Sequence, residues 1–326
     1  SLDEAPTEAA TATSARSARD LFRMRAAVRS LNADLLWYPT VFSWFPPPRG
    51  QRNLVGIHDC IAERFPDACF SNRRARWLWT IKVRWAIRRA TRFMTISEMS
   101  ARDLEAVYAI PRSKVTVTTL AAGESFRPAT PAEQEAARRD SGLKAGDRWF
   151  VYLGGLNPHK RVDLILQAMA ADGLEPCHLV LVGSWDGDRF HGAQSELQDF
   201  VDQSGLADRV HWLGRRSDDE LRPLLSGARA LLLPSMCEGF GLPAVEAAAC
   251  GSPVIATTES PLPELLDGGG LFVKPGDLEA LTTAMRRLGT DDALHRLMST
   301  AARDRASRLT WQDAARSTLE AIEACA

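Results

Sequence analysis

Short, uninterrupted apolar runs alternate with segments of helical periodicity along most of this 326-residue chain. Residues 149–153, 178–182 and 230–233 are such runs, and they are rich in Leu and Val. Apolar runs without polar alternation are typical of parallel strands that helices cover on both faces. Helical segments follow them, as at 162–170 and 218–225. The alternation therefore predicts an α/β fold of doubly wound, Rossmann-like layers.

The alternation is interrupted between residues 127 and 146, where Pro, Ala and Glu are frequent. We place a domain boundary there, so that one α/β domain covers residues 1–126 and a second begins at residue 127. Residues 1–16 are polar, and this composition predicts a loose segment before the first helix. In the first domain, the periodicity predicts a helix over 73–92 and a strand over 93–96. Ser97 is the expected cap of the next helix, with Ser100 as an alternative cap.

Charge and composition exclude several classes of protein. Lys plus Arg is 40, Asp plus Glu is 41 and the net charge is -1, which argues against a dedicated nucleic-acid-binding protein. The six cysteines show neither a CxxC pair nor a Cys/His ligand spacing, so we expect reduced, buried thiols and no metal site. No apolar run approaches the ~20 residues that a membrane span needs. The N-terminal residues lack the apolar core of a secretory signal, so we expect a cytoplasmic protein.

The segment with the most chemical information follows the apolar run at 230–233 and reads PSMCEGFGLPAVE. Gly239 and Gly241 allow the backbone to approach a ligand closely. The free N–H groups at the start of the next helix can bind an anion. Glu238 and Glu246 flank this helix start, and a carboxylate can accept two hydrogen bonds from a vicinal diol of a sugar or ribose. The alternative interpretation is an ordinary strand–turn–helix unit with a solvated glutamate.

The Glu-x7-Glu spacing within PSMCEGFGLPAVEAAACGSPVIA resembles the signature of retaining glycosyltransferases of family 4, which have the GT-B fold. Other segments resemble the same family in the same order, among them GIHDCIAERFP, VYLGGLNPHKRVDLILQA and HWLGRRSDDELRPLLSGARALLLPS. The resemblance covers the chain from about residue 50 to its C-terminus. It implies two Rossmann-like domains that face each other across a cleft. The donor domain would be 127–306, and a C-terminal helix within 307–326 would return to the first domain.

The resemblance also implies roles for individual residues. Glu246 would hold the ribose hydroxyls of a nucleoside diphosphate sugar, and Glu238 would face the hydroxyls of the transferred sugar. Lys160 would neutralise the diphosphate as a flexible point charge. His58, with Asp59 beside it, would lie near the sugar and the phosphates; without the resemblance, it would be interpreted as a histidine at the edge of the core. The remaining implied contacts are those of the backbone N–H groups of Phe240, Gly241 and Leu242 with sugar and phosphate, and those of Gly214 and Arg215 with the base.

Two departures from the family pattern affect these assignments. Gly155 stands where the family often has an arginine that adds a second positive charge on the phosphates. We assign Gly155 to the donor-binding loop and expect Arg161 to assist Lys160. The first strand–helix units of the acceptor domain, with their Gly-rich loop, are not recognisable. Either this half is abbreviated, or its first units lie outside the sequence.

The resemblance implies an enzyme that transfers a hexose, with mannose as the first guess, from a GDP- or UDP-sugar to a glycan or a lipid-linked acceptor. The nucleotide sugar is a co-substrate, and we expect no further cofactor. Lys160 and the helix start at Phe240–Leu242 would stabilise the charge of the leaving diphosphate without a metal. The product would be a polysaccharide or a glycolipid. The resemblance also implies that the acceptor attacks from the same face as the leaving group, so that the anomeric configuration is retained.

Alternatives of other classes remain open. One alternative is a non-catalytic protein that binds nucleotide sugars. It would be consistent with the two departures from the family pattern, the unrecognisable first strand–helix units and the glycine at position 155. An epimerase or a phosphorylase could share the two-domain plan, but no lysine stands out for a pyridoxal cofactor. A nicotinamide-dependent dehydrogenase is disfavoured because no GxGxxG follows a strand.

The predicted helix over 73–92 is rich in arginine and carries Trp77, Trp79 and Trp85. One interpretation is an interfacial helix that contacts anionic lipid headgroups at the inner face of a membrane. The other is a solvated basic face whose apolar side belongs to the core. Nucleic acid is a poor partner for this helix because the chain as a whole is close to neutral.

Overall fold

Two parallel β-sheets, each in its own unit of the chain, form the framework of the computed structural model, which describes residues 18–70, 72–183 and 191–325. By its internal contacts, the first unit comprises Ser1–Cys60, Phe70–Thr119 and Gln312–Ala326. The second unit holds Leu120–Trp311 together with Ile61–Cys69, a grouping that the sequence pattern did not predict. The predicted fold class, α/β with parallel sheets and alternating helices, is confirmed.

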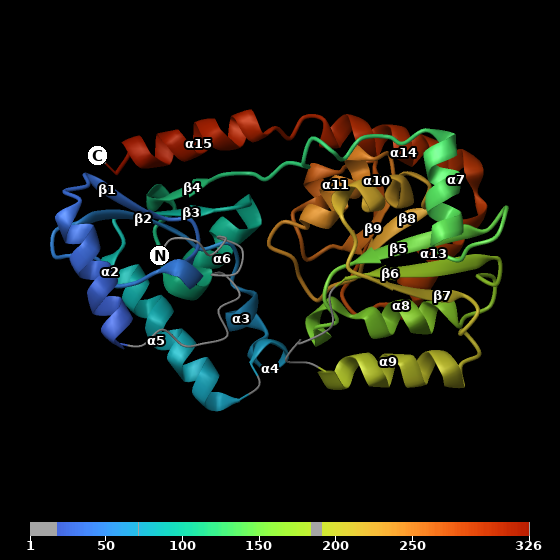
Figure 1. The fold of residues 1–326 in the computed structure, drawn as a ribbon, viewed down its shortest axis with the longest axis horizontal. Helices are drawn as coiled ribbons and strands as arrows, with labels where there is room; N and C mark the ends of the chain where they lie inside the picture. Colours follow the sequence, from blue (N-terminus) through green and yellow to red (C-terminus); the bar gives the residue numbers. More distant parts are fainter. Residues whose placement is uncertain (1–17, 71, 184–190, 326) are drawn as a thin grey trace. The chain divides into compact units, whose positions relative to one another are not determined.

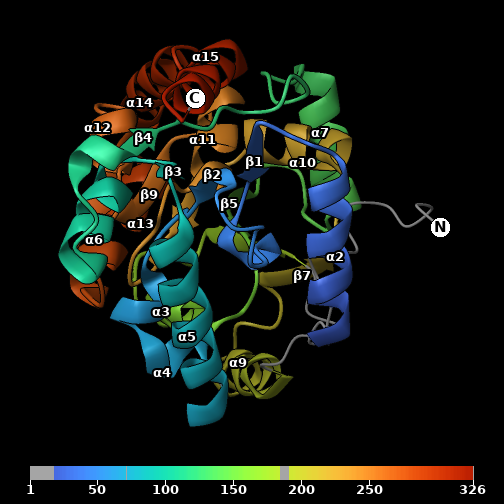
Figure 2. The same cartoon turned by 90° about the vertical axis from the view of Figure 1, so that its left-hand side faces the viewer.

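The first unit has a four-stranded sheet in the order β1-β2-β3-β4, with helices on both faces (Figures 1 and 2). Because side chains alternate along a strand, Val55 and Phe93 face one apolar cluster, while Leu54 and Met94 face another. Ala321 belongs to the second cluster, so the C-terminal helix covers that face. The elements are α2 (Ala18–Ser30), β1 (Leu35–Tyr38), η1 (Val41–Ser43), β2 (Arg52–Gly56), α5 (Arg73–Arg89), β3 (Arg92–Thr95), α6 (Glu98–Tyr108), η2 (Arg112–Lys114), β4 (Val115–Val117) and α15 (Trp311–Glu323).

The helix starts of this unit follow from local hydrogen bonding. Ser97 caps α6 by accepting a hydrogen bond from the Ser100 backbone N–H at 3.0 Å, as predicted. The alternative cap at Ser100 is wrong, because Ser100 already lies in the first turn. Asn72 caps α5 in the same way through the Ala75 N–H at 2.9 Å. Helix α5 ends before the predicted residue 92, because Arg92 begins β3.

The second unit has a six-stranded parallel sheet in the order β10-β9-β8-β5-β6-β7. Helices α8, α9 and α13 pack together on one side, and α7, α10, α11 and α14 pack on the other (Figure 1). The elements are α3 (Ile61–Arg64), α4 (Pro66–Cys69), α7 (Pro131–Asp140), β5 (Arg148–Leu153), η3 (Pro158–Lys160), α8 (Val162–Met169), β6 (Cys177–Val182), α9 (His191–Gln203), β7 (Val210–Gly214), α10 (Asp218–Ser226), β8 (Ala230–Leu233), α11 (Leu242–Ala249), β9 (Val254–Thr257), α12 (Leu262–Leu265), β10 (Gly270–Val273), α13 (Leu278–Thr290) and α14 (Asp292–Ala306).

The strand order determines where this sheet can bind a ligand. From β5 the chain proceeds outward through β6 and β7, and it then returns to β8 and proceeds the other way through β9 and β10. The order reverses between β5 and β8, which pair through Phe150–Ala230 and Val151–Leu231. In doubly wound sheets, ligands bind at such a reversal, beyond the carboxyl ends of the strands. The loops after β5 and β8 are therefore the first place to look for a site.

The structure also contains helices that the apolar pattern did not predict. Helix α7 occupies the stretch that interrupts the alternation, and its start is fixed by a capping box between Thr130 and Glu133. Helix α14 packs on α11 with few buried residues, Ala302 and Ala306 among them. Within the described ranges, no helix is both long and apolar enough to cross a bilayer.

Gly56, at the end of β2, allows the chain after β1 to approach closely. A Cβ at this position would lie 2.0 Å from the Pro39 carbonyl oxygen. We expect Gly56→Ala to lower the free energy of unfolding by about 2–4 kcal/mol, because backbone on both sides must move. Chemical denaturation would measure this. Gly123→Ala is the matched control, since its Cβ would meet nothing closer than 3.6 Å; equal losses for the two variants would contradict the explanation.

Candidate active site

The loops that follow β5 and β8 bring Lys160 and Glu238 into contact at the point where the strand order reverses. The Lys160 Nζ donates a hydrogen bond to Glu238 Oε1 at 2.8 Å. Lys160 ends the 3-10 turn η3, and Glu238 lies in the loop between β8 and α11. A backbone hydrogen bond from the Met236 N–H to the His159 carbonyl, at 2.7 Å, holds the two loops together. Two residues that the family resemblance assigns to phosphate and sugar are thus direct neighbours.

The Lys160–Glu238 pair is largely withdrawn from solvent, with side-chain exposures of 23% and 9%. Ser235 Oγ donates a second hydrogen bond to the same Glu238 oxygen at 2.6 Å. The Glu238 backbone N–H donates to the Glu259 carbonyl at 2.9 Å. A buried carboxylate needs such partners, because an uncompensated buried charge is strongly destabilising. Lys160 and Ser235 therefore hold the Glu238 carboxylate, while Glu259 holds the Glu238 backbone.

The N-terminus of α11 begins directly after this loop. Gly241 is the N-cap residue, with φ of 84°, and no side chain caps the helix start. A Cβ on Gly241 would lie 2.7 Å from Leu262 Cδ1, so both the backbone angle and the space require glycine. Phe240 is buried, and Leu242 is the first helical residue. The predicted donors at 240–242 thus belong to an uncapped helix start, which favours an anion.

Glu246 lies one turn further along α11 and faces the start of α10. Burial, followed by the nearby negative charge of Asp218, raises the pKa of Glu246 to about 7. Asp218 is the first residue of α10, and the loop before it contains the predicted base contacts. Gly214, with φ of 67°, ends β7, and Arg215 follows. The residues predicted to hold ribose and base therefore lie on neighbouring elements, α11 and the β7–α10 loop.

Gly155 and Arg161 occupy the ends of the loop that carries Lys160. The Gly155 carbonyl accepts a hydrogen bond from the Tyr152 hydroxyl, a buried group whose pKa is raised by desolvation. Arg161 has φ of 55° and directs its guanidinium at Asp163, with Nε–Oδ1 and Nη2–Oδ2 distances of 3.0 Å. Its assistance to Lys160 stays a prediction, and in this structure Asp163 is its partner.

His58 belongs to the first unit, at the carboxyl end of that sheet. Its Nε2 lies 3.0 Å from the Pro39 carbonyl oxygen, just beyond β1, and its own carbonyl accepts from Thr95 Oγ1 at 3.3 Å. The imidazole is exposed. His58 is therefore a positioned surface histidine rather than a core residue, and its proposed role toward the sugar stays a prediction.

The structure adds residues that the sequence did not single out. Arg64, on α3, forms an ion pair with Glu259 at 2.8 Å. Burial, and then the charge of Lys160, lower the pKa of His159 to about 4, so this imidazole is neutral at neutral pH. No spacing in the sequence connects Arg64 to Glu238, and its only signal is that it lies in the segment GIHDCIAERFP, which resembles the family. Ser235, by contrast, lies three residues before Glu238 within the segment PSMCEGFGLPAVE.

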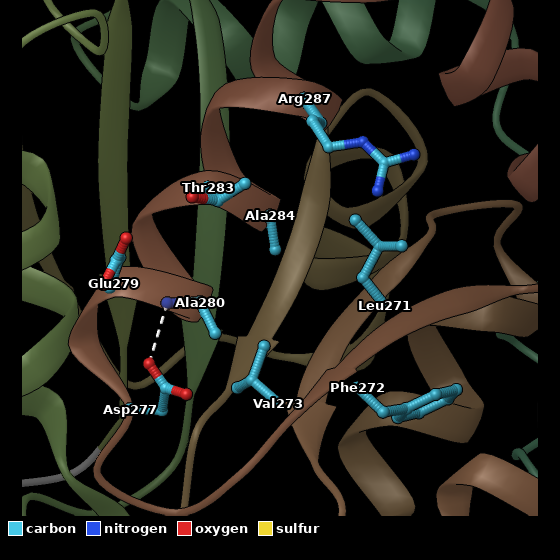
Figure 3. A pocket seen from close by; sticks show the side chains of 9 residues that line it. All are labelled: Leu271, Phe272, Val273, Asp277, Glu279, Ala280, Thr283, Ala284 and Arg287. Carbon is cyan, nitrogen blue, oxygen red and sulfur yellow. Dashed lines mark hydrogen bonds between the residues drawn. The ribbon is translucent and has the colours of Figure 1, made fainter.

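A shallow groove of about 430 Å³ lies elsewhere on the second unit, between β10 and α13 (Figure 3). Apolar side chains such as Leu271 and Ala284 line it. Its Asp277 carboxylate caps α13 by accepting from the Ala280 N–H at 2.9 Å. None of the predicted site residues lines this groove, so it is not the candidate site.

The family of the chain follows from its sequence relatives. The family profile described as "Glycosyl transferases group 1" matches residues 133–305, more than half of the chain. A second profile, "Glycosyltransferase Family 4", matches residues 7–119. The chain therefore belongs to the group 1 glycosyltransferases. This confirms the resemblance that the Glu-x7-Glu segment indicated, together with the predicted class of enzyme.

The sequence identity with individual relatives is low. O-antigen chain mannosyltransferase B of Escherichia coli is 25% identical over 286 residues, which are 86% of this chain and 72% of the relative. A D-inositol 3-phosphate glycosyltransferase of Stackebrandtia nassauensis is 32% identical over 232 residues, or 68% of this chain and 51% of the relative. The chain spans about half the length of several such curated relatives.

Solved structures share the fold. Sucrose-phosphate synthase from Thermosynechococcus elongatus superposes with a TM-score of 0.78 at 22% identity, over 94% of this chain and 77% of that one. Anabaena HepE, solved in complex with UDP-glucose, has a TM-score of 0.78 at 20% identity, over 93% of this chain and 81% of that one. These likenesses confirm the predicted GT-B class of fold.

The raised pKa of Glu246 predicts a pH-dependent stability. Its carboxyl has a pKa of about 7 in the folded chain against 4.5 ordinarily, so the folded state retains a proton that the unfolded state loses. Stability therefore falls as the pH rises from 4.5 to about 7, and the loss is complete above that value. Glu246→Gln removes the ionisation. We expect this variant to gain about 1–3 kcal/mol relative to wild type at pH 8 and little at pH 4.5.

Chemical denaturation at both pH values measures the two differences. Glu320→Gln is the control, because Glu320 is exposed on α15. A gain for Glu246→Gln that is equal at both pH values would contradict the assignment.

Proposed function

We propose that the chain transfers a hexosyl group, from a GDP- or UDP-sugar, to a glycan or a lipid-linked acceptor with retention of configuration and without a metal. The observation that carries the proposal is the Lys160–Glu238 pair beside the uncapped start of α11, where the strand order reverses. Glu246 and the β7–α10 loop then provide the ribose and base end of the same site. Mannose is our first choice of sugar.

The chemistry follows from where charge develops. The bond between the sugar C1 and the diphosphate oxygen breaks as the acceptor hydroxyl attacks C1 from the same face. The acceptor proton passes to the leaving diphosphate, which also receives the electron pair of the broken bond. Lys160 and the N–H groups at Phe240–Leu242 would stabilise this negative charge as it grows. Glu238, already held by Ser235, would accept hydrogen bonds from sugar hydroxyls and so position C1.

The names of similar proteins support this choice of substrates. The relatives include an O-antigen chain mannosyltransferase and an MMP alpha-(1->4)-mannosyltransferase of Mycolicibacterium hassiacum, and HepE was solved with UDP-glucose. These names support a mannose-like sugar and a nucleotide donor. The alternative is a non-catalytic partner protein that binds a nucleotide sugar, and turnover distinguishes it from an enzyme.

Turnover can be measured without knowing the acceptor, because water can take its place. The protein is first screened by thermal shift against GDP-mannose, UDP-glucose and ADP-glucose, since a ligand that binds the folded state raises the melting temperature. We expect GDP-mannose or UDP-glucose to give the largest shift, and its slow hydrolysis to release the sugar first as the anomer present in the donor. Proton NMR follows that anomer before it equilibrates.

Lys160→Met tests the role of the lysine. We expect hydrolysis to fall about 100- to 1000-fold, the effect typical of removing one group that stabilises developing charge. Lys144→Met is the control, because Lys144 is exposed and lies before the amino end of β5. Binding without turnover would favour the non-catalytic alternative, and release of the opposite anomer would exclude retention.

We also propose that helix α5 contacts an anionic membrane surface, so that a cytoplasmic enzyme could reach a lipid-linked acceptor. One face of α5 exposes apolar side chains, with Trp77 62%, Leu78 53% and Trp85 47% exposed. The side chains of Arg84 and Arg88 are exposed on the same stretch of helix. Bulky apolar groups beside arginines are the pattern that binds at the interface of an anionic bilayer.

Vesicle co-sedimentation tests this contact. We expect binding to vesicles of phosphatidylcholine with phosphatidylglycerol, and none to phosphatidylcholine alone. The double variant Arg84→Gln/Arg88→Gln should bind about thirtyfold more weakly, since each arginine near the surface contributes about 1 kcal/mol. Arg305→Gln/Arg308→Gln is the control for lost charge. Equal binding of the two double variants, or equal binding to vesicles with and without phosphatidylglycerol, would contradict the proposal.

A further inference from the structure

We propose that Arg64 is a second diphosphate-binding cation of this site, released to the ligand from its ion pair with Glu259. The inference rests on the proposed function, because it concerns the same donor-binding site. Sequence spacing does not place Arg64 near Lys160, and the structure makes the connection through the second unit.

The position of Arg64 follows from contacts within that unit. Arg64 ends α3, and the short helix α4 that follows packs against η3, the turn that ends in Lys160. Arg64 Nη2 donates to Glu259 Oε2 at 2.8 Å. The backbone carbonyl of the same Glu259 accepts from the Glu238 N–H at 2.9 Å. The two ion pairs, Lys160–Glu238 and Arg64–Glu259, are therefore linked through one backbone hydrogen bond.

The charges of the site show why a second cation is needed. Lys160 is balanced by Glu238, Arg64 is balanced by Glu259, and His159 is neutral. A sugar diphosphate carries two negative charges, and Gly155 supplies no side chain to meet them. Arg161 is paired with Asp163, and Lys160 has a carboxylate as its neighbour. Beside the N–H groups at the start of α11, part of the negative charge of the ligand is therefore left without a cationic side chain. Arg64 is a further cation on the loops that surround this pair, and its planar guanidinium suits a phosphate.

The two ion pairs differ in how firmly they are held. Glu238 is 9% exposed and accepts from Ser235 as well, so Lys160 has a fixed partner. Glu259 is 44% exposed and Arg64 27% exposed. An ion pair that is open to water contributes little and exchanges readily. A diphosphate can therefore take Arg64 from Glu259 at small cost, whereas the buried pair keeps its geometry.

A purely structural role for Arg64 makes a different prediction. If Arg64 only anchored the Glu259 loop, then removing either member of the pair would have the same consequence. If Arg64 binds the diphosphate and Glu259 competes for it, then the two removals act in opposite directions. This difference in sign is what the experiment measures.

The experiment measures binding of UDP and GDP, and of uridine and guanosine, by calorimetry with the whole chain. We expect Arg64→Gln to weaken binding of the preferred diphosphate about tenfold and to leave the matching nucleoside unchanged. Arg64→Lys should recover part of the loss. Glu259→Gln should tighten the diphosphate about two- to threefold. Arg305→Gln, which removes the exposed partner of Asp267, is the control for a lost surface charge.

The outcomes separate this inference from the proposed function. If Arg64→Gln binds the diphosphate as tightly as the wild-type chain does, while Lys160→Met binds it more weakly, the role of Arg64 is overturned. The proposed donor site would then still be supported. Parallel losses in Arg64→Gln and Glu259→Gln, for nucleoside and diphosphate alike, would also overturn it in favour of an anchoring role. No binding of either diphosphate by the wild-type chain would overturn both proposals.

Discussion

The ion pair between Lys160 and Glu238 joins the two halves of the six-stranded sheet at the point where their directions diverge. The lysine comes from the loop after β5 in one half, and the glutamate from the loop after β8 in the other. Together they present a lysine that is held by a carboxylate, and a carboxylate that accepts from both Lys160 and Ser235. Because these groups are largely withdrawn from water, their geometry is set before any ligand arrives, which is what stabilisation of a developing charge requires.

Two kinds of contact surround the Lys160–Glu238 pair: rigid backbone packing, and an ion pair whose partners can exchange. Gly241 and Leu262 fix the start of α11 through backbone conformation and close packing. Glu259 and Arg64 lie at the more exposed side, where charges can change partners. Under the proposed function, the buried pair would hold its geometry while the exposed pair exchanges partners with the ligand.

The ionisation of Glu246 is controlled by its burial in the second unit. Its carboxyl is held partly in its neutral form by burial and by Asp218, so the free chain loses stability when it ionises. A ribose diol that donates two hydrogen bonds would favour the ionised form. Under the proposed function, a ligand that supplies hydrogen-bond donors would therefore relieve the cost of ionising Glu246.

The sequence alone determined the α/β class, most strands, the cap at Ser97 and the helix start that separates Glu238 from Glu246, because apolar period, capping residues and glycines act over a few neighbouring residues. It did not predict α14, whose apolar face is narrow, or α7, which begins where the alternation stops. The contact of Lys160 with Glu238, the second ion pair at Arg64 and the pKa of Glu246 were decided only by the tertiary structure. These depend on strand order and burial, which bring together residues that are far apart in the chain.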